Sequence, residues 1–333
     1  MTVTERAPDA GAADRIEAMA RQAGSVDGVA PLGEQPLRAL RGPAGGARHF
    51  LATDPDEPDA DSPDADSAGA ATGGGSADPA IVGYAQLVGA GDEASAELVV
   101  DPSHRRRGHG SALVRAVLEA EPGAAMWAHG DMPSARALAE GLGLARTREL
   151  LKMRRRAAGG PALPDPHPPG GIETGTLAEA ASEGGSRWPG MDTREEFLRV
   201  NNAAFSWHPE QGGWTREQLD DRLGVDWVDP GAVFLAVDAA GETPRLAGFH
   251  WTKTVAEPGQ PVEGEVYVVA VDPSDQGRGL GGLLTAVGVE HLEGRAGAES
   301  VVLYVEGDNL PAIRTYERLG FAVEHRDVTY ASR

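Results

Sequence analysis

The feature that most constrains this chain is an internal repeat, in which a pattern from the first half returns in the second. The run Val-Asp-Pro-Ser at Val100–Ser103 recurs at Val271–Ser274. The Gly-rich run that follows it, Arg105–Gly110, matches Gln276–Gly281 at the same offset of 171 residues (100 to 271). Repetition in the same order and at the same spacing predicts a duplicated domain.

A second match supports the duplication and fixes its extent. Gly141–Leu144 resembles Arg318–Phe321, now at an offset of 177 residues (141 to 318). The chain has 333 residues, which suits two domains of about 150 residues each. Ala157–Gly171 is rich in Pro and Gly and cannot hold a helix or a central strand. We therefore expect a first domain over 1–156, a linker over 157–171 and a second domain over 172–333.

A low-complexity segment interrupts the first domain. Residues 54–79 consist mainly of Asp, Pro, Ala, Gly and Ser, a composition that predicts disorder. The segment lies between two apolar runs, 49–53 and 80–88, which we expect to be neighbouring strands. Because loop-closure entropy grows only logarithmically with length, such an insertion costs little stability.

The second half has a clear alternation of predicted elements. We expect helices at 193–205, 215–223, 280–295 and 311–319, and strands at 232–238, 245–254, 264–271, 300–306 and 321–330. Thr193 is the expected N-cap of the first of these helices, with Glu196 three residues on. The first half follows the same order. The fold class is therefore α/β, with a mixed, mostly antiparallel central sheet flanked by helices in each domain.

Composition excludes several classes of function. The formal net charge is −21, so binding to nucleic acid or to an anionic membrane is unfavourable. The chain has no cysteine, which excludes disulfides, thiolate metal sites and a cysteine nucleophile. It shows no signal peptide and no apolar stretch of spanning length. We expect a cytoplasmic monomer that acts on a small molecule.

The repeated Gly-rich run has the chemistry of a phosphate cradle. In each half a strand ends in Val-Asp-Pro, and Arg/Gln-x-x-Gly-x-Gly then opens a helix. Glycines let the backbone approach a ligand closely, and the free N–H groups at a helix start favour a pyrophosphate. A dinucleotide-binding site is the main alternative, but the run lies in the middle of each predicted domain and not in the first β-α turn, where that site is found.

The same run resembles the GCN5-related N-acetyltransferase superfamily, in which it wraps the pyrophosphate of coenzyme A (CoA). Asn309–Phe321 resembles a further motif of that family, Asn-x-x-Ala-x-x-x-Tyr-x-x-x-Gly-Phe. The resemblance implies an acyltransferase that uses acetyl-CoA as co-substrate and needs no metal. The residues that it implies for CoA binding are Leu98, Val99, Val100, Arg106, Arg107, Gly108, His109, Gly110 and Ser111 in the first half, and Val269, Ala270, Val271, Gln276, Gly277, Arg278, Gly279, Leu280, Gly281, Gly282, Asn309, Leu310, Pro311, Ala312, Ile313 and Arg314 in the second.

Two residues of the second half suit acetyl transfer to an amine. Glu265 begins the strand that leads to Val269 and is a candidate general base, whereas Tyr316 is a candidate acid for the CoA sulfur. Strict alternation predicts that Glu265, Tyr267, Val269 and Val271 share one face of the strand. A backbone N–H near Val269 is a candidate oxyanion donor. The alternatives are a solvated edge carboxylate for Glu265 and a packed aromatic for Tyr316.

The first half lacks these groups. The offsets place Ala94 at the position of Glu265, Met132 at that of Asn309 and Ala139 at that of Tyr316. The Gly-rich run nevertheless remains. We therefore expect the first domain to be non-catalytic and to hold CoA without turnover.

Longer segments resemble a family of tandem acetyltransferases that acetylate the cysteinyl amine of cysteinyl-glucosaminyl-inositol to give mycothiol. The segments are 27–35, 199–205, 208–214, 248–253, 264–267 and 303–309. In that family the C-terminal domain is the active one. The resemblance implies substrate contacts by Glu34, Glu210, Lys253, Glu265 and Tyr304, and because Glu34 belongs to the first domain it implies a substrate between the domains. Another small amine or a peptide N-terminus remains an alternative substrate, and a non-catalytic acetyl-CoA sensor an alternative function. Arg154–Arg156 receive no role.

Overall fold

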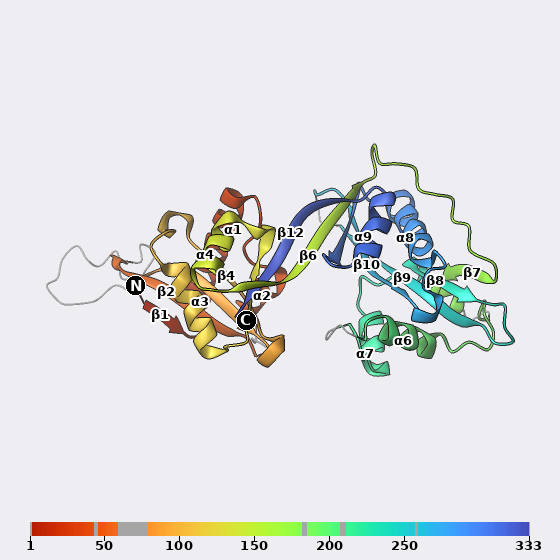
Figure 1. Cartoon of the computed structure of the whole chain (residues 1–333), viewed down its shortest axis with the longest axis horizontal. Helices are drawn as coiled ribbons and strands as arrows, with labels where there is room; N and C mark the ends of the chain where they lie inside the picture. Colours follow the sequence, from red (N-terminus) through yellow and green to blue (C-terminus); the bar gives the residue numbers. More distant parts are fainter. Residues whose placement is uncertain are drawn as a thin grey trace. The chain divides into compact units, whose positions relative to one another are not determined.

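The computed structural model describes residues 2–42, 46–58, 79–181, 185–206, 211–256 and 259–332. The chain divides into two compact units (Figure 1). The first unit comprises Met1–Glu149 with Arg326–Arg333, and the second comprises Leu150–His325. No helix in these described ranges is long and apolar enough to cross a membrane.

The first unit is a sheet with helices packed on both faces. Its strands run in the order β1-β2-β3-β4-β5-β12-β6, and of the pairs with a described register only β4–β5 is parallel. Helix α1 packs against Tyr84 and Val99 on one face, and α3 packs against Phe50 and Leu87 on the other. The elements are β1 (Thr2–Glu5), α1 (Ala10–Asp27), α2 (Glu34–Ala39), β2 (Arg48–Pro58), β3 (Pro79–Val88), β4 (Ser95–Val100), α3 (His109–Ala120), β5 (Ala125–Ala128), α4 (Pro133–Gly141) and β6 (Ala145–Arg156).

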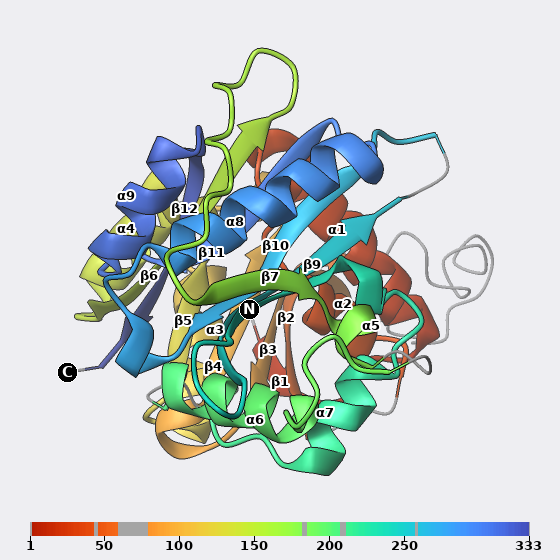
Figure 2. The same ribbon diagram turned by 90° about the vertical axis from the view of Figure 1, so that its right-hand side faces the viewer.

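The second unit repeats this plan. Its strand order is β12-β6-β11-β10-β9-β8-β7, and β10–β11 is its parallel pair. Figures 1 and 2 show α8 and α9 on one face of the sheet and α6 and α7 on the other. The elements are β7 (Ile172–Thr176), α5 (Leu177–Ala180), α6 (Thr193–Ala204), α7 (Arg216–Leu223), β8 (Val233–Asp238), β9 (Arg245–Val255), β10 (Glu263–Val271), α8 (Leu280–Glu290), β11 (Ser300–Glu306), α9 (Leu310–Arg318) and β12 (Ala322–Ala331).

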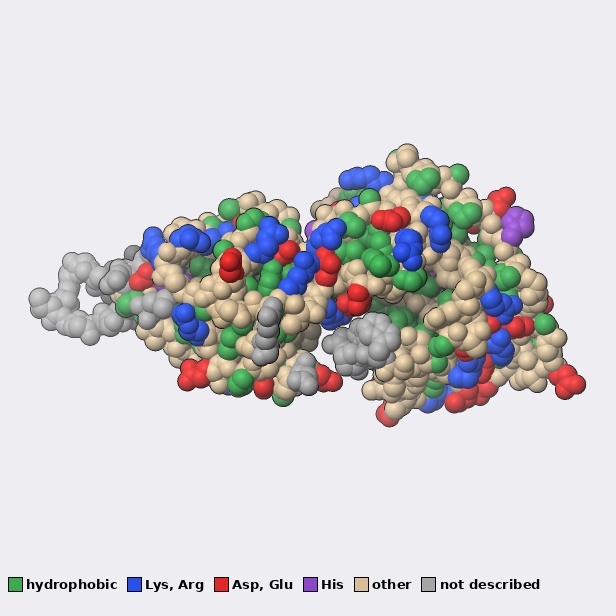
Figure 3. Space-filling view, viewed as in Figure 1, with side chains coloured by type: hydrophobic (Ala, Val, Ile, Leu, Met, Phe, Trp, Pro, Cys, Tyr) green, Lys and Arg blue, Asp and Glu red, His purple; other side chains and the backbone are tan. Residues whose placement is uncertain are grey.

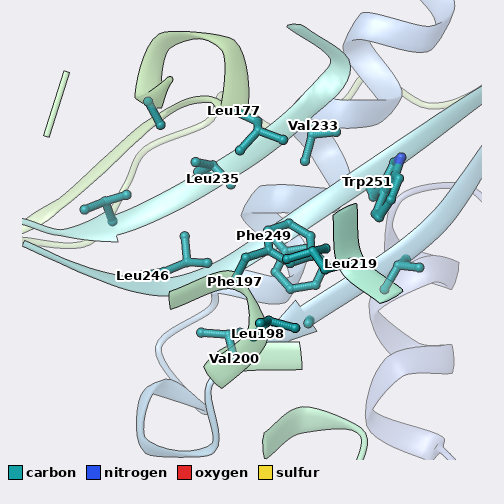
Figure 4. Packing of buried hydrophobic residues seen from close by; sticks show 14 of the residues in the cluster. Leu177, Phe197, Leu198, Val200, Leu219, Val233, Leu235, Leu246, Phe249 and Trp251 are labelled. Carbon is teal, nitrogen blue, oxygen red and sulfur yellow. The ribbon is translucent and has the colours of Figure 1, made fainter. Parts of the chain in front are cut away.

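Aromatic packing fixes α6 on the second sheet. Phe197 of α6 stacks on Phe249 of β9 with ring centroids 3.9 Å apart, and Trp251 meets Phe197 edge to face (Figure 4). All three side chains are almost wholly buried. Offset and edge-to-face aromatic pairs contribute beyond their buried area, so this cluster holds the α6 face of the sheet firmly.

The sequence expectations for these elements are largely confirmed. Every predicted strand and helix of the second half is present within a few residues, and 157–171 contains no helix or strand. The predicted N-cap Thr193 is wrong, because Asp192 caps α6 by accepting from the amides of Arg194 and Glu195. The predicted disordered loop 54–79 falls mainly on 59–78, which lie outside the described residues, but its ends belong to β2 and β3.

The two long strands β6 and β12 explain why the compact units differ from the predicted domain limits. Each strand runs through both units, since the units divide after Glu149 and after His325. Leu150–Arg156 of β6 pairs with β11, whereas Val328–Tyr330 of β12 pairs with β5. Each repeat thus completes its sheet with the last strand of the other. The sequence could not show this, because the 177-residue offset makes Lys152 and Thr329 equivalent and either strand fits either place.

The negative charge is not gathered into one patch on the face drawn in Figure 3. Acidic and basic side chains are interspersed there on both units. Several acidic side chains of the described residues pair with arginines, among them Glu5 with Arg48 and Glu149 with Arg326.

Candidate active site

In each unit the parallel strand pair separates partway along its length. The β10–β11 ladder joins Glu263–Glu265 to Ser300–Val302, and β10 then continues to Val271 beside β9. In the first unit the β4–β5 ladder joins only Ser95–Ala96 to Ala125–Met126. The strand residues predicted for CoA binding, Leu98–Val100 and Val269–Val271, come after the point of separation. The geometry is that of a split into which an extended ligand arm can enter.

The Gly-rich runs form the turns that open α3 and α8. Gly108 and Gly279 are the N-cap residues of these helices, with φ of +91° and +81°. This left-handed backbone suits glycine, and it points the first amides of each helix outward. Gly277 also has a positive φ of +80°, and in the first unit Arg106 takes the equivalent conformation at +63°. The two turns therefore share one backbone shape, as a common phosphate cradle requires.

The side chains of the two turns are anchored differently. In the first unit Arg105 donates two hydrogen bonds to Asp27, each 2.8 Å long. In the second unit Arg278 bonds to Asp275, which is almost wholly buried, and to Asp238. The carboxylates preorganise both turns before any ligand arrives.

A cavity of about 550 Å³ opens beside the first turn. Its walls are β4, β5, α3 and α4, all of the first unit. The cavity is lined by most of the CoA-binding residues predicted for this half: Leu98, Val99, Val100, Arg106, Gly108, His109, Gly110 and Ser111. Arg107, also predicted, is not part of the lining, and its guanidinium lies 4.0 Å from Asp54 instead.

His109, the first residue of α3, is 3% exposed. Neither ring nitrogen has a hydrogen-bond partner within the described part of the chain. Burial lowers the pKa of His109, so the ring is neutral at physiological pH. Its second-unit counterpart at offset 171, Leu280, is also buried.

The candidate base and a predicted substrate residue meet directly in the second unit. Lys253 of β9 is the register partner of Glu265, with its Nζ 3.8 Å from Oε2. The same Nζ lies 5.3 Å from the Trp227 ring centroid and 5.8 Å from that of Tyr267. Aromatic faces attract cations, so these rings fix the ammonium at the start of the split.

A β-bulge corrects the predicted strand face. The β10–β9 register shifts between Val266 and Val268, and Tyr267 is the extra residue. Glu265 and Tyr267 lie on the α6 face, whereas Val269 and Val271 pack with the clusters under α8. The prediction that all four share one face is wrong, because the bulge reverses the alternation. It thereby puts the candidate base Glu265 and the side chains of Val269 and Val271 on different faces of β10.

The bulge also changes the counterpart of Glu265 in the first unit. Strand β4 pairs with β3 without a register shift, so it lacks the extra residue that β10 has at its bulge. The offset of 171 residues between the repeats therefore does not apply to residues of β10 that precede the bulge. Glu265 pairs with Val302, and the equivalent parallel pair is Ser95 with Ala125. Ser95, not Ala94, therefore stands in the place of the base. A serine there leaves the first unit without a carboxylate at that point.

The candidate acid is partly buried. Tyr316 of α9 packs against the core under α8, and its ring meets Phe321 edge to face at 6.0 Å. Burial raises the pKa of Tyr316 to about 12. The phenol is therefore protonated at neutral pH, as an acid must be before it donates.

The remaining residues of the Asn-to-Phe motif have mixed roles. Asn309 is the N-cap of α9 and accepts from the Ala312 amide at 3.2 Å. Ile313 is buried in the core, whereas Leu310 is more than half exposed. The motif is thus partly a helix-start signal, which the Asn-x-x-Ala spacing already encodes.

The other predicted substrate residues lie in three places. Tyr304 follows Val302 by two residues on β11, so it shares the face of Glu265, and it is 49% exposed. Glu34 is the first residue of α2 in the first unit and pairs with Arg38. Glu210 lies outside the described residues. The structure brings Glu265 and Lys253 together, with Tyr304 on the same face.

Sequence reasoning missed the part played by β6 in the second unit. Lys152 is the register partner of Tyr304, and its Nζ lies 5.9 Å from the tyrosine ring centroid. Arg154 donates to Glu263, to Ser300 Oγ and to Glu324. These cations border the same sheet face as Glu265. Only knowledge of the strand exchange could have placed them there. No cluster of three or more metal-ligating side chains occurs among the residues that the structure describes.

Comparison with known proteins agrees with this architecture. The Acetyltransferase (GNAT) family matches residues 198–321, and the Acetyltransferase (GNAT) domain matches residues 76–143. The fold is similar to a GCN5-related N-acetyltransferase from Sphaerobacter thermophilus, with a TM-score of 0.65, 22% identity and coverage of 98% and 94% of the two chains. It is also similar to a tandem GNAT protein from the clavulanic acid biosynthesis pathway, with a TM-score of 0.59, 20% identity and coverage of 99% and 98%. The chain is a tandem acetyltransferase of the GNAT class.

Closer relatives narrow the family. The chain is 46% identical to a mycothiol acetyltransferase from Mycobacteroides abscessus, over 95% of this chain and 94% of the relative. Mycothiol acetyltransferases from Rhodococcus erythropolis (44% identical, covering 97% and 96%) and Nocardia farcinica (46%, covering 97% and 95%) are similar over the same extent. The chain belongs to the mycothiol acetyltransferase family.

Proposed function

We propose that this enzyme transfers the acetyl group of acetyl-CoA to the cysteinyl amine of cysteinyl-glucosaminyl-inositol, giving mycothiol and free CoA, which is the reaction of a mycothiol synthase. The observation that carries the proposal is the Glu265–Lys253 pair at the start of the β10–β11 split. The pair lies on β10, and the other end of this strand leads into the Gly-rich turn that opens α8. Identity of 44–46% to mycothiol acetyltransferases over almost the whole chain supports the substrate.

The second unit supplies a group for each requirement of the reaction. Acetyl-CoA provides the activated acyl carbon. The turn 276–282 and the N-terminus of α8 hold the pyrophosphate, and the backbone of Val269–Val271 contacts the pantetheine. Asn309–Arg314 at the start of α9 borders the same ligand.

The chemical steps follow from these positions. Glu265 takes a proton from the ammonium of the acceptor, directly or through water, and the free amine attacks the thioester carbonyl. A backbone N–H near Val269 donates to the oxyanion of the tetrahedral intermediate. When the C–S bond breaks, Tyr316 donates its proton to the sulfur, and the tyrosinate takes up the proton that the attacking nitrogen loses, which leaves a neutral amide and a CoA thiol.

The acceptor is rich in hydroxyl groups, and the proposed contacts suit it. Carboxylates of Glu34 and Glu210 accept from hydroxyls, and the ammonium of Lys253 donates to them. The half-exposed ring of Tyr304 offers an apolar face and a hydroxyl. The first unit, with Ser95 in place of the base, binds CoA in its 550 Å³ cavity and does not turn it over.

Product analysis tests the proposal. Purified enzyme is incubated with acetyl-CoA and cysteinyl-glucosaminyl-inositol, and mass spectrometry follows the acceptor. We expect mycothiol and an equal amount of CoA, with far slower acetylation of an aminoglycoside or of a peptide N-terminus. Efficient acetylation of one of those amines and none of the thiol sugar would contradict the assigned substrate.

A further inference from the structure

The segment between α1 and α2 lines the edge of the cavity in the first unit and connects directly to Glu34. The connection from α1 to α2 contributes Asp27, Val29 and Pro31 to the lining of the cavity. The next helix, α2, begins at Glu34. The rim segment, defined as residues 27–33, therefore ends immediately before a proposed substrate residue.

Two side chains hold the rim segment at its two ends. At one end the guanidinium of Arg105, from the Gly-rich turn, makes two 2.8 Å hydrogen bonds with Asp27. At the other end the Gly33 amide donates to Oε2 of Glu97 on β4 at 2.6 Å. Planar Arg–carboxylate pairing has strict geometry, so a movement of the turn is passed to Asp27.

The attachment at Glu97 is itself part of the split. Nε2 of His129, which follows β5, lies 3.1 Å from Oε2 of Glu97, just beyond the last β4–β5 pair. Asp327 lies 3.5 Å from the other ring nitrogen of His129 and accepts from the Gly130 amide at 2.9 Å. His129 lines the cavity. A ligand arm that enters between β4 and β5 therefore meets His129, whose ring contacts the carboxylate that fixes Gly33.

Helix α2 has few restraints of its own. It is six residues long, and the ion pair between Glu34 and Arg38 is exposed. A helix this short is not stable by itself in water. The position of Glu34 thus depends on the anchoring of the rim segment and on tertiary contacts such as the 3.2 Å bond from Gln86 to the Pro36 carbonyl.

We propose that the cavity of the first unit is an effector site, in which a bound CoA ester fixes the rim segment through Arg105 and Glu97 and so sets the position of Glu34. The pyrophosphate is held at the start of α3 beside Arg105, and the pantetheine end lies towards Glu97 and His129. Occupancy restrains both ends of residues 27–33 together. This inference rests on the proposed roles of the cavity as a CoA site and of Glu34 as an acceptor contact. It gives the unit without a base a reason to keep its phosphate turn.

Hydrogen exchange measured by mass spectrometry tests this proposal on the full chain. Acetyl-CoA at ten times its Kd should slow exchange in peptides over 28–38 by about tenfold, the limit that mass action sets. Asp27→Asn should still bind acetyl-CoA at two sites by calorimetry but lose most of this protection, and its KM for the acceptor should rise severalfold with little change in kcat. Glu5→Gln, which breaks a similar Arg–carboxylate pair with Arg48 on β1 and β2, is the matched control and should behave as wild type.

Each result bears on the proposal. Gly108→Trp should abolish the protection of 28–38 while the second site still binds. Acetyl-CoA bound in the first unit with no change in exchange over 28–38, or full protection in Asp27→Asn, overturns the effector role and leaves the proposed reaction standing. A single CoA site, unaffected by Gly108→Trp, overturns the effector role and the first-unit CoA site together. Failure of the wild type to acetylate the thiol sugar contradicts the proposed function separately.

Discussion

Lys253 and Glu265 are direct cross-strand partners on β9 and β10, with Nζ 3.8 Å from the carboxylate, at the residue where the β10–β11 ladder ends. Both side chains are largely but not wholly buried, at 29% and 19% exposure. An opposite charge at this distance holds the carboxylate in one place on the sheet face. This residual exposure leaves it accessible to an incoming amine.

The first prediction concerns the base. Glu265→Gln should lower kcat by about 10²- to 10⁴-fold, because a general base contributes that much to a proton transfer. The Kd for acetyl-CoA, from calorimetry, should change little, since the carboxylate faces the amine. Glu263→Gln is the matched control, because Glu263 lies on the same strand face and pairs with Arg154. Near-normal turnover in Glu265→Gln would remove this residue from the mechanism.

The second prediction concerns the leaving group. Tyr316→Phe should reduce kcat less than Glu265→Gln does, because a thiol with a pKa of about 8.5 leaves without much help at neutral pH. Burial raises the pKa of Tyr316 to about 12. The wild type should therefore lose no activity through deprotonation of Tyr316 below that pH. Steady-state rates of the wild type and the two variants from pH 6 to 10 measure the loss of kcat and its pH dependence. A larger loss in Tyr316→Phe than in Glu265→Gln would assign the tyrosine to positioning of the thioester.

The third prediction concerns the packing of α8, which carries the phosphate turn. A Cβ on Gly288 would lie 2.1 Å from Nδ1 of His250, whose side chain is wholly buried and bonded to the Leu284 carbonyl at 2.8 Å. Gly288→Ala should therefore destabilise the protein by about 2 kcal/mol or more, the usual cost of overpacking. Gly294→Ala is the control, since its Cβ has nothing within 4 Å among the described residues. Urea denaturation showing equal stability for the two variants would contradict this account.

The fourth prediction concerns pH. Burial alone lowers the pKa of His129, but its hydrogen bonds to Asp327 and Glu97 outweigh this and raise the pKa to about 9, from an ordinary 6.5. A raised pKa means that the protonated ring stabilises the fold fully below pH 6.5 and that this stability is lost as pH rises through 9. The free energy of unfolding should fall across this window by at most about 1.4 kcal/mol per pH unit. Chemical denaturation should show that slope in the wild type and a weaker one in His129→Gln. An unchanged slope in the variant would mean that another group titrates.

The sequence predicted the parts of this protein that repeat and missed those that differ between the repeats. The Gly-rich turns, the element order and the position of Glu265 on its strand were readable because their spacing is fixed by the glycines at a helix start and by strand and helix periods. The bulge at Tyr267 was not readable, since one extra residue in a strand of alternating apolar residues leaves no signal in composition. It moved Val269 to the other face and made Ser95 the counterpart of Glu265.

The strand exchange and the Glu97–His129 bridge were equally hidden from sequence reasoning. Lys152 and Thr329 are equivalent by the repeat, so local patterns cannot say which strand pairs with β11. Glu97, His129 and Asp327 come from β4, from the residue after β5 and from β12. Only long-range topology brings them together, so no spacing motif marks the cluster.

The measurement that most directly tests where the chemistry occurs compares one substitution in the two phosphate turns. Gly279→Trp and Gly108→Trp each place a bulky side chain at the N-cap of a helix, where φ is positive, so both disturb the turn in the same way. Turnover of acetyl-CoA with saturating cysteinyl-glucosaminyl-inositol is measured for each, with circular dichroism confirming the fold. The account predicts that Gly279→Trp abolishes turnover, whereas Gly108→Trp retains kcat with a raised KM for the acceptor. Substantial turnover in a folded Gly279→Trp variant, or its loss only in Gly108→Trp, would contradict the assignment of catalysis to the second unit.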